Sequence, residues 1–317
     1  MLTHEEMIGL QAEKHDLIDV HNFRTEEAYV QHLIHSFAYT QASTLAEDKI
    51  ILDLGCNTGY GSEILFQKAK KVVGVDVSEK AISTAKKQYG ILGIDFQLID
   101  GKQLPFEDNE FDMVISCQVI EHIIDYNVYF NELRRVLSPS GIVIFTTPNA
   151  VLRIDPGMKP WNKFHVREFD HSEFQAQLNI HFPTVLIMGL FAEETLYLIE
   201  KNRNLRALKR ARRIAREAAK IPQPSGYQIQ DSIRSAIKRM LPESILNKLR
   251  KLLASWRKLL ASSSHTIQKI DKSFIEEHGL EDFFYRTDKL SAALDFFAVC
   301  SDDENAILDI KHKFKMD

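Results

Sequence analysis

The sequence predicts an α/β protein built on a doubly wound parallel sheet. From Ile50 onward, short apolar runs bounded by glycine or polar residues alternate with segments of helical periodicity, which is the pattern that such sheets produce. A glycine-rich turn follows the first apolar run, and Asp76 ends the second. The 317 residues are enough for one large domain with an elaboration, or for two domains.

The glycine-rich turn predicts a nucleotide-type cofactor site. Ile50 to Leu54 is a short apolar run typical of a strand buried on both faces. Gly55 and Gly59 permit a sharp turn and a close approach of the backbone to a ligand. The helix expected after this turn directs its N-terminal N–H groups and its positive dipole end at the ligand. In such folds a carboxylate at the position of Asp76 accepts hydrogen bonds from ribose hydroxyls.

The spacing of the glycines argues against two common nucleotide sites. A dinucleotide fingerprint that begins at Gly55 requires glycine where Asn57 and Tyr60 stand, and the lysine of a phosphate-binding Walker loop is missing. Asp53 to Gly59 instead resembles the D-x-G-x-G-x-G signature of class I S-adenosylmethionine-dependent methyltransferases. Asn57 takes the place of the middle glycine, and asparagine is among the residues that tolerate left-handed backbone angles.

The N-terminus and the cysteines bear on the compartment. The N-terminus lacks a basic region followed by an apolar stretch, and no apolar run approaches the roughly 20 residues that span a bilayer. We therefore expect neither secretion nor a transmembrane anchor. Cys56, Cys117 and Cys300 are far apart and lack C-x-x-C spacing, which indicates a reducing cytoplasm and no structural zinc.

Further strands and helices are expected on both sides of the turn. Residues 1–47 form an N-terminal helical cover, with Thr25 as the cap of a helix that either covers the sheet or closes over the cofactor. Ser78 caps a helix through Gln88. More strands are predicted at residues 96–99, 113–117, 142–146 and 182–189, with helices between them.

Three later motifs extend the resemblance. They are Leu104 to Asp112 before the fourth strand, Glu121-His122 after it, and Glu132 to Gly141 before the fifth. With them, residues 50–149 resemble the methyltransferase type 11 group. That resemblance implies a Rossmann-like sheet of seven strands whose last strand, near residues 294–300, is antiparallel.

The resemblance also implies S-adenosyl-L-methionine as the cofactor. Gly55 and Gly59 would lie against its methionine part, Asp76 would hold the ribose, and Asp100 with Gly101 would reach the adenine amine. Leu104 would pack near the adenine ring and Gln118 beside the cofactor. The complete set of cofactor-binding residues expected from the resemblance is Asp53, Gly55, Asn57, Gly59, Asp76, Val77, Asp100, Gly101, Leu104 and Gln118.

The loop after the fifth strand is the expected acceptor site, because open α/β folds bind ligands beyond the carboxyl ends of their strands. Residues 162–169 resemble a motif, broadly N-P-F-H-x-R-E-F/Y, of bacterial methyltransferases often associated with surface-glycan gene sets; Lys163 stands where proline is usual. The predicted substrate-binding residues are Asn149, Trp161, Asn162, Arg167 and Glu168.

Two histidines are predicted to be catalytic. If the acceptor is a hydroxyl, a base assists its attack on the methyl group; His165 is the first candidate and His122 the second. His165 and Arg167 have an alternative role in ordering the loop through Glu168 or Asp170. Glu121 and His122 are equally compatible with a helix-start acid and a packed histidine. No metal-ligand cluster is evident from spacing, so no metal site is predicted.

A basic helical insertion is expected between the sixth and seventh strands. Lys201 to Leu260 contains 17 lysines and arginines against three acidic residues, a net charge of +14, whereas the rest of the chain carries −18. We therefore divide the chain into a methyltransferase core (1–192), a basic helical insertion (193–264) and a return to the core (265–317). The basic helices would pack on the domain or on a second copy of the chain, or lie on an anionic membrane surface.

The sequence thus predicts a cytoplasmic O-methyltransferase that acts on a small molecule or glycan precursor, with peripheral contact to the inner membrane surface as an open alternative. An RNA-directed methyltransferase using the basic insertion is a second reading, although no Asn-Pro-Pro-Tyr-type tetrad is present, so a nucleic-acid partner is not expected. A non-catalytic scaffold with a methyltransferase fold is the third.

Overall fold

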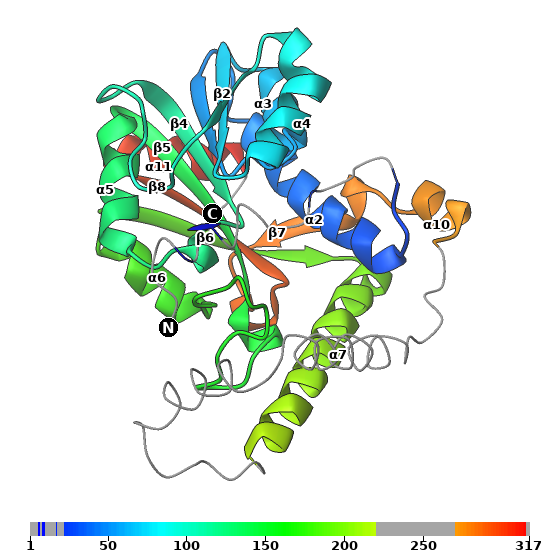
Figure 1. The fold of residues 1–317 in the computed structure, drawn as a ribbon. Coiled ribbons are helices and arrows are strands. Elements are labelled where there is room, and N and C mark those ends of the chain that lie inside the picture. Colours follow the sequence, from blue (N-terminus) through cyan, green and yellow to red (C-terminus); the bar gives the residue numbers. More distant parts are fainter. Residues whose placement is uncertain (1–5, 7, 10–16, 18–21, 220–269, 315–317) are drawn as a thin grey trace, which may run out of the picture. The chain divides into compact units, whose positions relative to one another are not determined.

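The computed structural model describes residues 6, 8–9, 17, 22–219 and 270–314 (Figure 1). The chain divides into two compact units, residues 1–210 with 270–317 and residues 211–269. Only residues 211–219 of the second unit are described, and they continue a helix that begins in the first. The predicted domain limits at residues 192 and 264 stay predictions.

The first unit is built on one mixed sheet, in the order β3-β2-β1-β4-β5-β8-β6-β7. Strands β1 to β5 are parallel, and β8 pairs antiparallel with both β5 and β6. The strands are β1 Ile50–Leu54, β2 Lys71–Asp76, β3 Asp95–Leu98, β4 Phe111–Cys117, β5 Leu137–Pro148, β6 Thr184–Ala192, β7 Phe283–Arg286 and β8 Asp295–Ser301. The predicted α/β doubly wound class is confirmed, and so is the antiparallel strand near residues 294–300.

The predicted count of seven strands is wrong, because the described residues form eight. The additional strand is β7, which pairs antiparallel with the end of β6 at the edge of the sheet. It comprises only four residues, Phe-Phe-Tyr-Arg, and such a short run shows too little alternation to be distinguished from a loop by its pattern.

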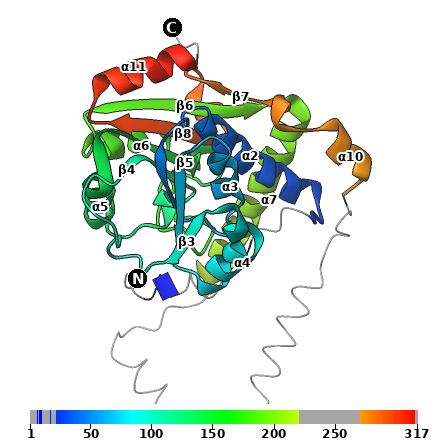
Figure 2. The same cartoon turned by 90° about the horizontal axis from the view of Figure 1, so that it is seen from above.

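Helices cover both faces of the sheet (Figures 1 and 2). Along β1, Ile51 belongs to the apolar core on one face and Leu52 to the core on the other, because successive side chains of a strand point to opposite faces. Helices α2, α3, α4 and α11 contribute to the first core, and α5 and α6 to the second. Their bounds are α2 Glu26–Ser43, α3 Tyr60–Phe66, α4 Glu79–Tyr89, α5 Tyr126–Val136, α6 His171–Asn179 and α11 Glu304–Lys313.

The strand order creates a site between β1 and β4. The chain moves outward from β1 to β2 and β3, and then returns to place β4 on the other side of β1. The chain therefore leaves β1 toward β2 and leaves β4 in the opposite direction, toward β5. Such a reversal opens a crevice at the carboxyl ends of the two strands. Asp53, the glycine turn, Asp76 and Gln118 all lie at this edge because each stands near the end of its strand.

The segment between β6 and β8 begins with helix α7, Glu194–Ala219. Its first half packs into the first unit, where Leu196 and Leu208 are buried. A second helix, α10 (Lys272–Glu277), precedes β7. The part of the predicted basic insertion beyond residue 219 lies outside the described residues.

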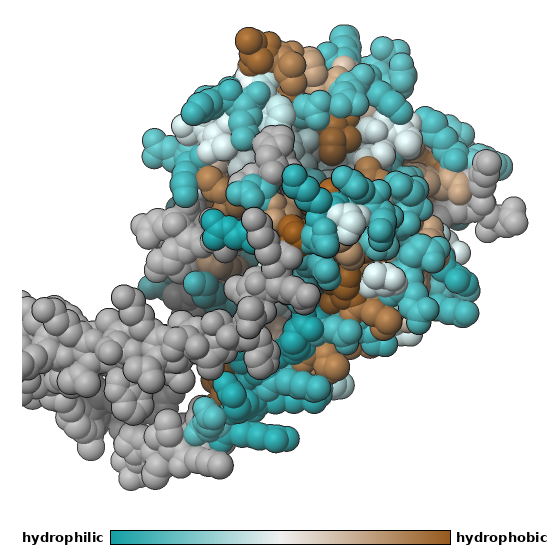
Figure 3. All heavy atoms as spheres, turned by 90° about the vertical axis from the view of Figure 1, so that its right-hand side faces the viewer, coloured by the Kyte–Doolittle hydropathy of each residue, from teal (hydrophilic) through white to brown (hydrophobic). Residues whose placement is uncertain are grey.

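The surface of the described part is largely polar in one view. On the face drawn in Figure 3, hydrophilic side chains predominate and hydrophobic ones form small groups between them. Scattered exposed hydrophobic residues of this kind are normal for a globular protein. Among the described helices, none combines the length and the apolar composition needed to cross a bilayer.

Candidate functional site

The turn after β1 adopts the conformation that its glycines permit. Gly55 and Gly59 have φ values of 81° and 86°, and Asn57 between them has a φ of 46°. The N–H groups of Gly55 and Cys56 donate to the carbonyl oxygen of Val75, at 2.8 and 3.0 Å, and so fasten the turn to the end of β2. Asn57 therefore occupies the left-handed region that its residue type tolerates.

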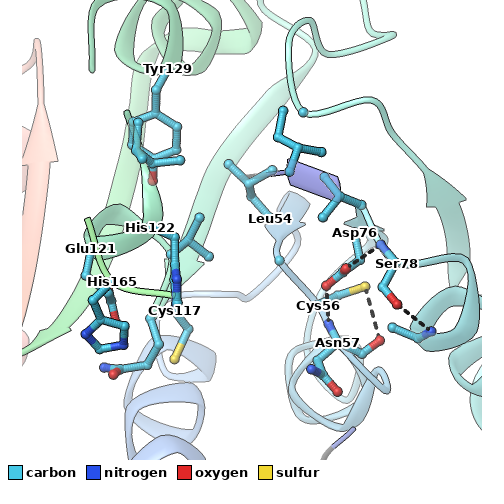
Figure 4. Close-up of a pocket in the computed structure, with 18 of the residues that line it drawn as sticks. Leu54, Cys56, Asn57, Asp76, Ser78, Cys117, Glu121, His122, Tyr129 and His165 are labelled. Carbon is cyan, nitrogen blue, oxygen red and sulfur yellow. Dashed lines mark hydrogen bonds between the residues drawn. The ribbon is translucent and has the colours of Figure 1, made fainter. Parts of the chain in front are cut away.

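Asp76 lies at the end of β2, beside this turn (Figure 4). Its Oδ2 accepts a hydrogen bond from the N–H of Asn57 at 3.0 Å, and its Oδ1 accepts one from the N–H of Ser78 at 2.8 Å. Each carboxylate oxygen can accept more than one hydrogen bond. The backbone thus fixes the orientation of the carboxylate.

Asp53 lies beneath the turn rather than in the cavity. It is fully buried and accepts hydrogen bonds from the hydroxyls of Tyr39, at 2.9 Å, and Ser62, at 2.6 Å. Burial raises the pKa of Asp53 to about 6, although these two hydroxyls act in the opposite direction. The residue connects β1 to α2 and α3, so its role is to support the turn.

The loop after β3 forms another part of the wall. Asp100 is exposed, and its Oδ1 accepts from the N–H groups of Lys102 and Gln103, at 2.9 and 3.3 Å. The hydrogen bond from Lys102 is the main reason that the pKa of Asp100 lies below its usual value. Gly101 has a φ of 73°, and Leu104 is buried at the wall. Asp100 thus shapes the loop that presents Gly101 and Leu104.

A cavity of about 400 Å³ connects these elements. It is lined by eleven of the predicted site residues: Gly55, Asn57, Asp76, Val77, Gly101, Leu104, Gln118, His122, Trp161, Asn162 and His165. The remaining predicted residues lie outside its lining: Asp53, Gly59, Asp100, Asn149, Arg167 and Glu168. The structure therefore brings the predicted cofactor and acceptor segments together around one space.

Glu121, His122 and His165 form the wall opposite Asp76 (Figure 4). One oxygen or nitrogen atom of each lies within 4.8 Å of the others. Nδ1 of His122 lies 2.9 Å from the carbonyl oxygen of Phe164, which can only accept, so Nδ1 carries the proton. The rings of His122 and His165 meet edge to face, with centroids 4.8 Å apart.

Glu121 is a buried acid in this wall. Only 1% of it is exposed, and its Oε2 accepts a hydrogen bond from the Thr147 hydroxyl at 3.1 Å. Its Oε1 is buried with no hydrogen-bond partner among the described residues. Burial raises the pKa of Glu121 to about 8. The carboxyl group therefore lies in the wall with unused accepting capacity.

A buried hydrogen-bond network holds His165 in position. Its Nδ1 lies 2.7 Å from Oε1 of Glu168, and Glu168 in turn receives two hydrogen bonds from Arg153, both 3.0 Å long. Arg153 also donates to Oδ1 of Asn204, on α7, at 3.1 Å. Burial alone would raise the pKa of Glu168, but His165 and Arg153 hold it below its usual value. The predicted structural tie between His165 and Glu168 is present.

Two other predicted substrate-binding residues also have partners within the protein. Asn149 is fully buried, and its Nδ2 donates to the carbonyl oxygens of Leu290, Ser291 and Ala293. Arg167 is half-buried and pairs with Glu173 at 3.2 Å. Both contacts hold the loop in place.

Trp161 and Asn162, by contrast, line the cavity. The Arg153 guanidinium lies 4.5 Å from the centroid of the Trp161 ring. These two residues are the part of the predicted acceptor set that a ligand can reach.

Several cavity residues were not predicted. Gln31, His35 and Tyr39 come from α2, and Arg203 comes from α7. Oε1 and Oε2 of Glu200 accept hydrogen bonds from Arg203. For Arg203 the sequence offered only a basic helix, and nothing in its spacing connects it to the glycine turn. For α2, the prediction that the helix either covers the sheet or closes over the cofactor pointed to the correct region.

Known proteins resemble this chain over the same region. Residues 52–145 match the family model described as a methyltransferase domain. The chain is 32% identical over 152 residues to a Mycolicibacterium smegmatis protein named "Probable S-adenosylmethionine-dependent methyltransferase", an alignment that covers 48% of this chain and 54% of that protein.

Two further relatives are named for O-methylation. A ubiquinone biosynthesis O-methyltransferase of Bartonella tribocorum is 31% identical over 135 residues, 41% of this chain and 55% of that protein. A fatty-acid O-methyltransferase of Mycolicibacterium smegmatis is 30% identical over 120 residues, 37% and 43% of the two chains. The chain spans about half the length of these curated relatives.

The family match begins in β1 and ends in β5. It therefore includes the glycine turn, Asp76 and the Glu121-His122 pair, which are the features that form the two walls of the cavity. Residues 52–145 thus form a methyltransferase domain, and over this region the chain is similar to S-adenosylmethionine-dependent methyltransferases.

Proposed function

We propose that this protein binds S-adenosyl-L-methionine and transfers its methyl group to a hydroxyl of a small molecule or glycan precursor. The observation that carries the proposal is the position of Asp76. Its carboxylate is oriented by the N–H groups of Asn57 and Ser78, and it lines the same cavity as Glu121, His122 and His165 on the other wall.

The first wall suits the cofactor. Asp76 accepts hydrogen bonds from the ribose hydroxyls, as carboxylates at this place in such folds do. Gly55 lies against the methionine part, and a side chain there is excluded because a Cβ would come within 2.5 Å of Val119 Cγ2. Gly101 and Leu104 provide the wall beside the adenine ring.

The second wall suits the acceptor. Methyl transfer breaks the bond between the methyl carbon and sulfur as a bond to the acceptor oxygen forms; the sulfonium becomes a thioether, and the hydroxyl loses its proton. The sulfonium methyl is already activated, so positioning the acceptor in line supplies much of the rate increase. His165 is the first candidate to accept this proton and His122 the second, and Glu121 lies beside both.

Two further observations support the proposed acceptor atom and the proposed compartment. Two relatives are named O-methyltransferases, which favours oxygen as the acceptor atom. The three cysteines of the chain are buried free thiols, which favours the cytoplasm. Contact of the basic helices with a membrane surface or a second copy of the chain remains a proposal, since most of those residues lie outside the described part.

The test has two stages. Calorimetric titration of the full chain with S-adenosyl-L-methionine should show one binding site. Mass spectrometry should then detect a methyl ether after incubation with sugar nucleotides, lipid-linked sugars or phenolic quinone precursors, or a methyl ester after incubation with fatty acids. Absence of cofactor binding would instead support a scaffold. Salt-dependent retention of RNA that accepts methyl groups would support the RNA-directed alternative.

A further inference from the structure

The wall opposite Asp76 brings His165 together with the adjacent residues Glu121 and His122, three side chains of types that can bind a metal ion. Glu121 and His122 lie in the short 3-10 turn Ile120–His122 after β4, whereas His165 comes from the loop between β5 and α6. The backbone joins these segments, because the N–H groups of Val166 and Arg167 donate to the carbonyl oxygen of Glu121, at 2.8 and 3.3 Å. The cluster is therefore held together by main-chain hydrogen bonds.

Both histidines are oriented as metal-ligating histidines usually are. Such a histidine donates its second ring N–H to a carbonyl or carboxylate, which fixes the ring and leaves the lone pair on the other nitrogen. His122 uses Nδ1 toward the Phe164 carbonyl, at 2.9 Å, and His165 uses Nδ1 toward the Glu168 carboxylate, at 2.7 Å. In the neutral rings the lone pair is therefore on Nε2 in both cases.

Glu121 supplies an independent indication of a ligand. An acceptor atom that is buried without a hydrogen bond is unfavourable, because it has lost its contact with water and gained nothing in return. Oε1 of Glu121 is such an atom among the described residues, although the other oxygen is satisfied by Thr147. A cation at Oε1 would compensate this cost.

We propose that Glu121, His122 and His165 bind one divalent transition-metal cation, such as Zn²⁺. Two imidazoles and one carboxylate are a common ligand set of catalytic zinc and leave a position open. With bonds of about 2.1 Å, ligand atoms lie within about 4 Å of one another. One potential ligand atom of each residue lies within 4.8 Å of the others, so binding requires the three side chains to move closer together.

The metal site extends the proposed function. Binding of the cation does not depend on that function, whereas a catalytic role of the cation rests on it. An acceptor hydroxyl in the open position would be held at the wall that faces Asp76 across the cavity. A bound cation lowers the pKa of a coordinated hydroxyl, so its proton would leave to solvent water during methyl transfer. In this form the two histidines act as ligands, and no electron transfer is involved.

The test is a calorimetric titration of the untagged full chain, freed of metal with a chelator, with Zn²⁺ alone. Wild type should bind one cation that is lost, or weakened by at least about 10-fold, in the variants Glu121→Gln and His165→Asn. His181→Gln is the matched control, because His181 stacks on Phe130 away from the cluster, and its titration should equal that of the wild type. No binding by the wild type, or equal binding by the cluster variants, would overturn the proposal.

A second titration separates this inference from the proposed function. Each metal-free protein is titrated with S-adenosyl-L-methionine, and circular dichroism reports whether the variant is folded. Cofactor binding without cation binding overturns the metal site alone. Cation binding without cofactor binding supports the metal site and overturns the proposed function. If Glu121→Gln does not fold, the less central His165→Asn decides.

Discussion

Arg153 and Glu168 form a buried, bidentate ion pair beside the cavity. Nε and one terminal nitrogen of Arg153 each donate to a different oxygen of Glu168, both at 3.0 Å, and at most 6% of either side chain is exposed. The pair connects the loop after β5 to His165 on one side and, through Asn204, to α7 on the other. It therefore couples the wall of the site to an element about 50 residues further along the chain.

Loss of one partner of this pair should be costly. Arg153→Met leaves the Glu168 carboxylate buried without its guanidinium, and we expect the free energy of unfolding to fall by about 3–5 kcal/mol. Arg167→Met is the control in the same loop, because its pair with Glu173 is exposed and should contribute no more than about 1 kcal/mol. Urea denaturation measures both. Similar losses in the two variants would show that the buried pair contributes no more to the free energy of unfolding than the exposed pair does.

Asp76 should control the affinity for the cofactor. In Asp76→Ala the ribose loses a charged acceptor, and we expect S-adenosyl-L-methionine to bind at least about 10-fold more weakly by calorimetry. Asp95→Ala, at an exposed position at the start of β3, is the control and should bind as the wild type does. Thermal unfolding of both variants checks that the turn is intact. An unchanged affinity in folded Asp76→Ala would exclude Asp76 from the site.

Gly59 should be intolerant of a side chain. Its φ is 86°, and a Cβ there would lie 2.8 Å from the ring of Phe96, so Gly59→Ala should destabilise the fold by about 1–3 kcal/mol. Gly90→Ala is the matched control: Gly90 has a φ of −60° and open space around its Cβ position. Its stability should stay the same or rise slightly. Equal effects in denaturation experiments would contradict this account of the turn.

Asp53 should make stability depend on pH. Its pKa is raised to about 6 in the folded protein, whereas an unfolded aspartate titrates near about 3.9. Between about pH 4 and pH 6 the folded state therefore binds more protons, so the free energy of unfolding falls as pH rises through this window.

Asp53→Asn removes this titration and keeps an acceptor for the Tyr39 hydroxyl. As pH rises from about 4 to about 6, the free energy of unfolding of the wild type should therefore fall relative to that of Asp53→Asn. Urea denaturation at several pH values between 4 and 7 measures it. Parallel curves would mean that the pKa of Asp53 is not raised.

The turn and the cavity wall around Asp76 could be predicted because their determinants are local. Gly55, Asn57 and Gly59 all have positive φ, a constraint that the residue types express directly in the sequence. The end of β2 follows from its apolar run, so the position of Asp76 could also be predicted. β7 could not, since four residues pair with β6 through backbone groups that any sequence supplies.

The acceptor loop shows the limit of motif reasoning. Its charged residues were predicted as one set, yet Trp161 and Asn162 line the cavity while Asn149, Arg167 and Glu168 face protein partners. Composition identifies a polar loop, but the direction of each side chain depends on neighbours from residues 290–293, α6 and α7. Only the folded chain provides those neighbours.

By itself, the sequence determined the fold class, the methyltransferase family and the residues around Asp76, because strand periodicity, glycine conformations and a carboxylate at a strand end are all local properties. The tertiary structure decided the opposite wall. Glu121 and His165 are 44 positions apart in the sequence, and they meet because main-chain hydrogen bonds join the turn after β4 to the loop after β5. Burial of Glu121 and support of His165 by Arg153 and Asn204 likewise arise from packing between distant segments, which no spacing along the chain records.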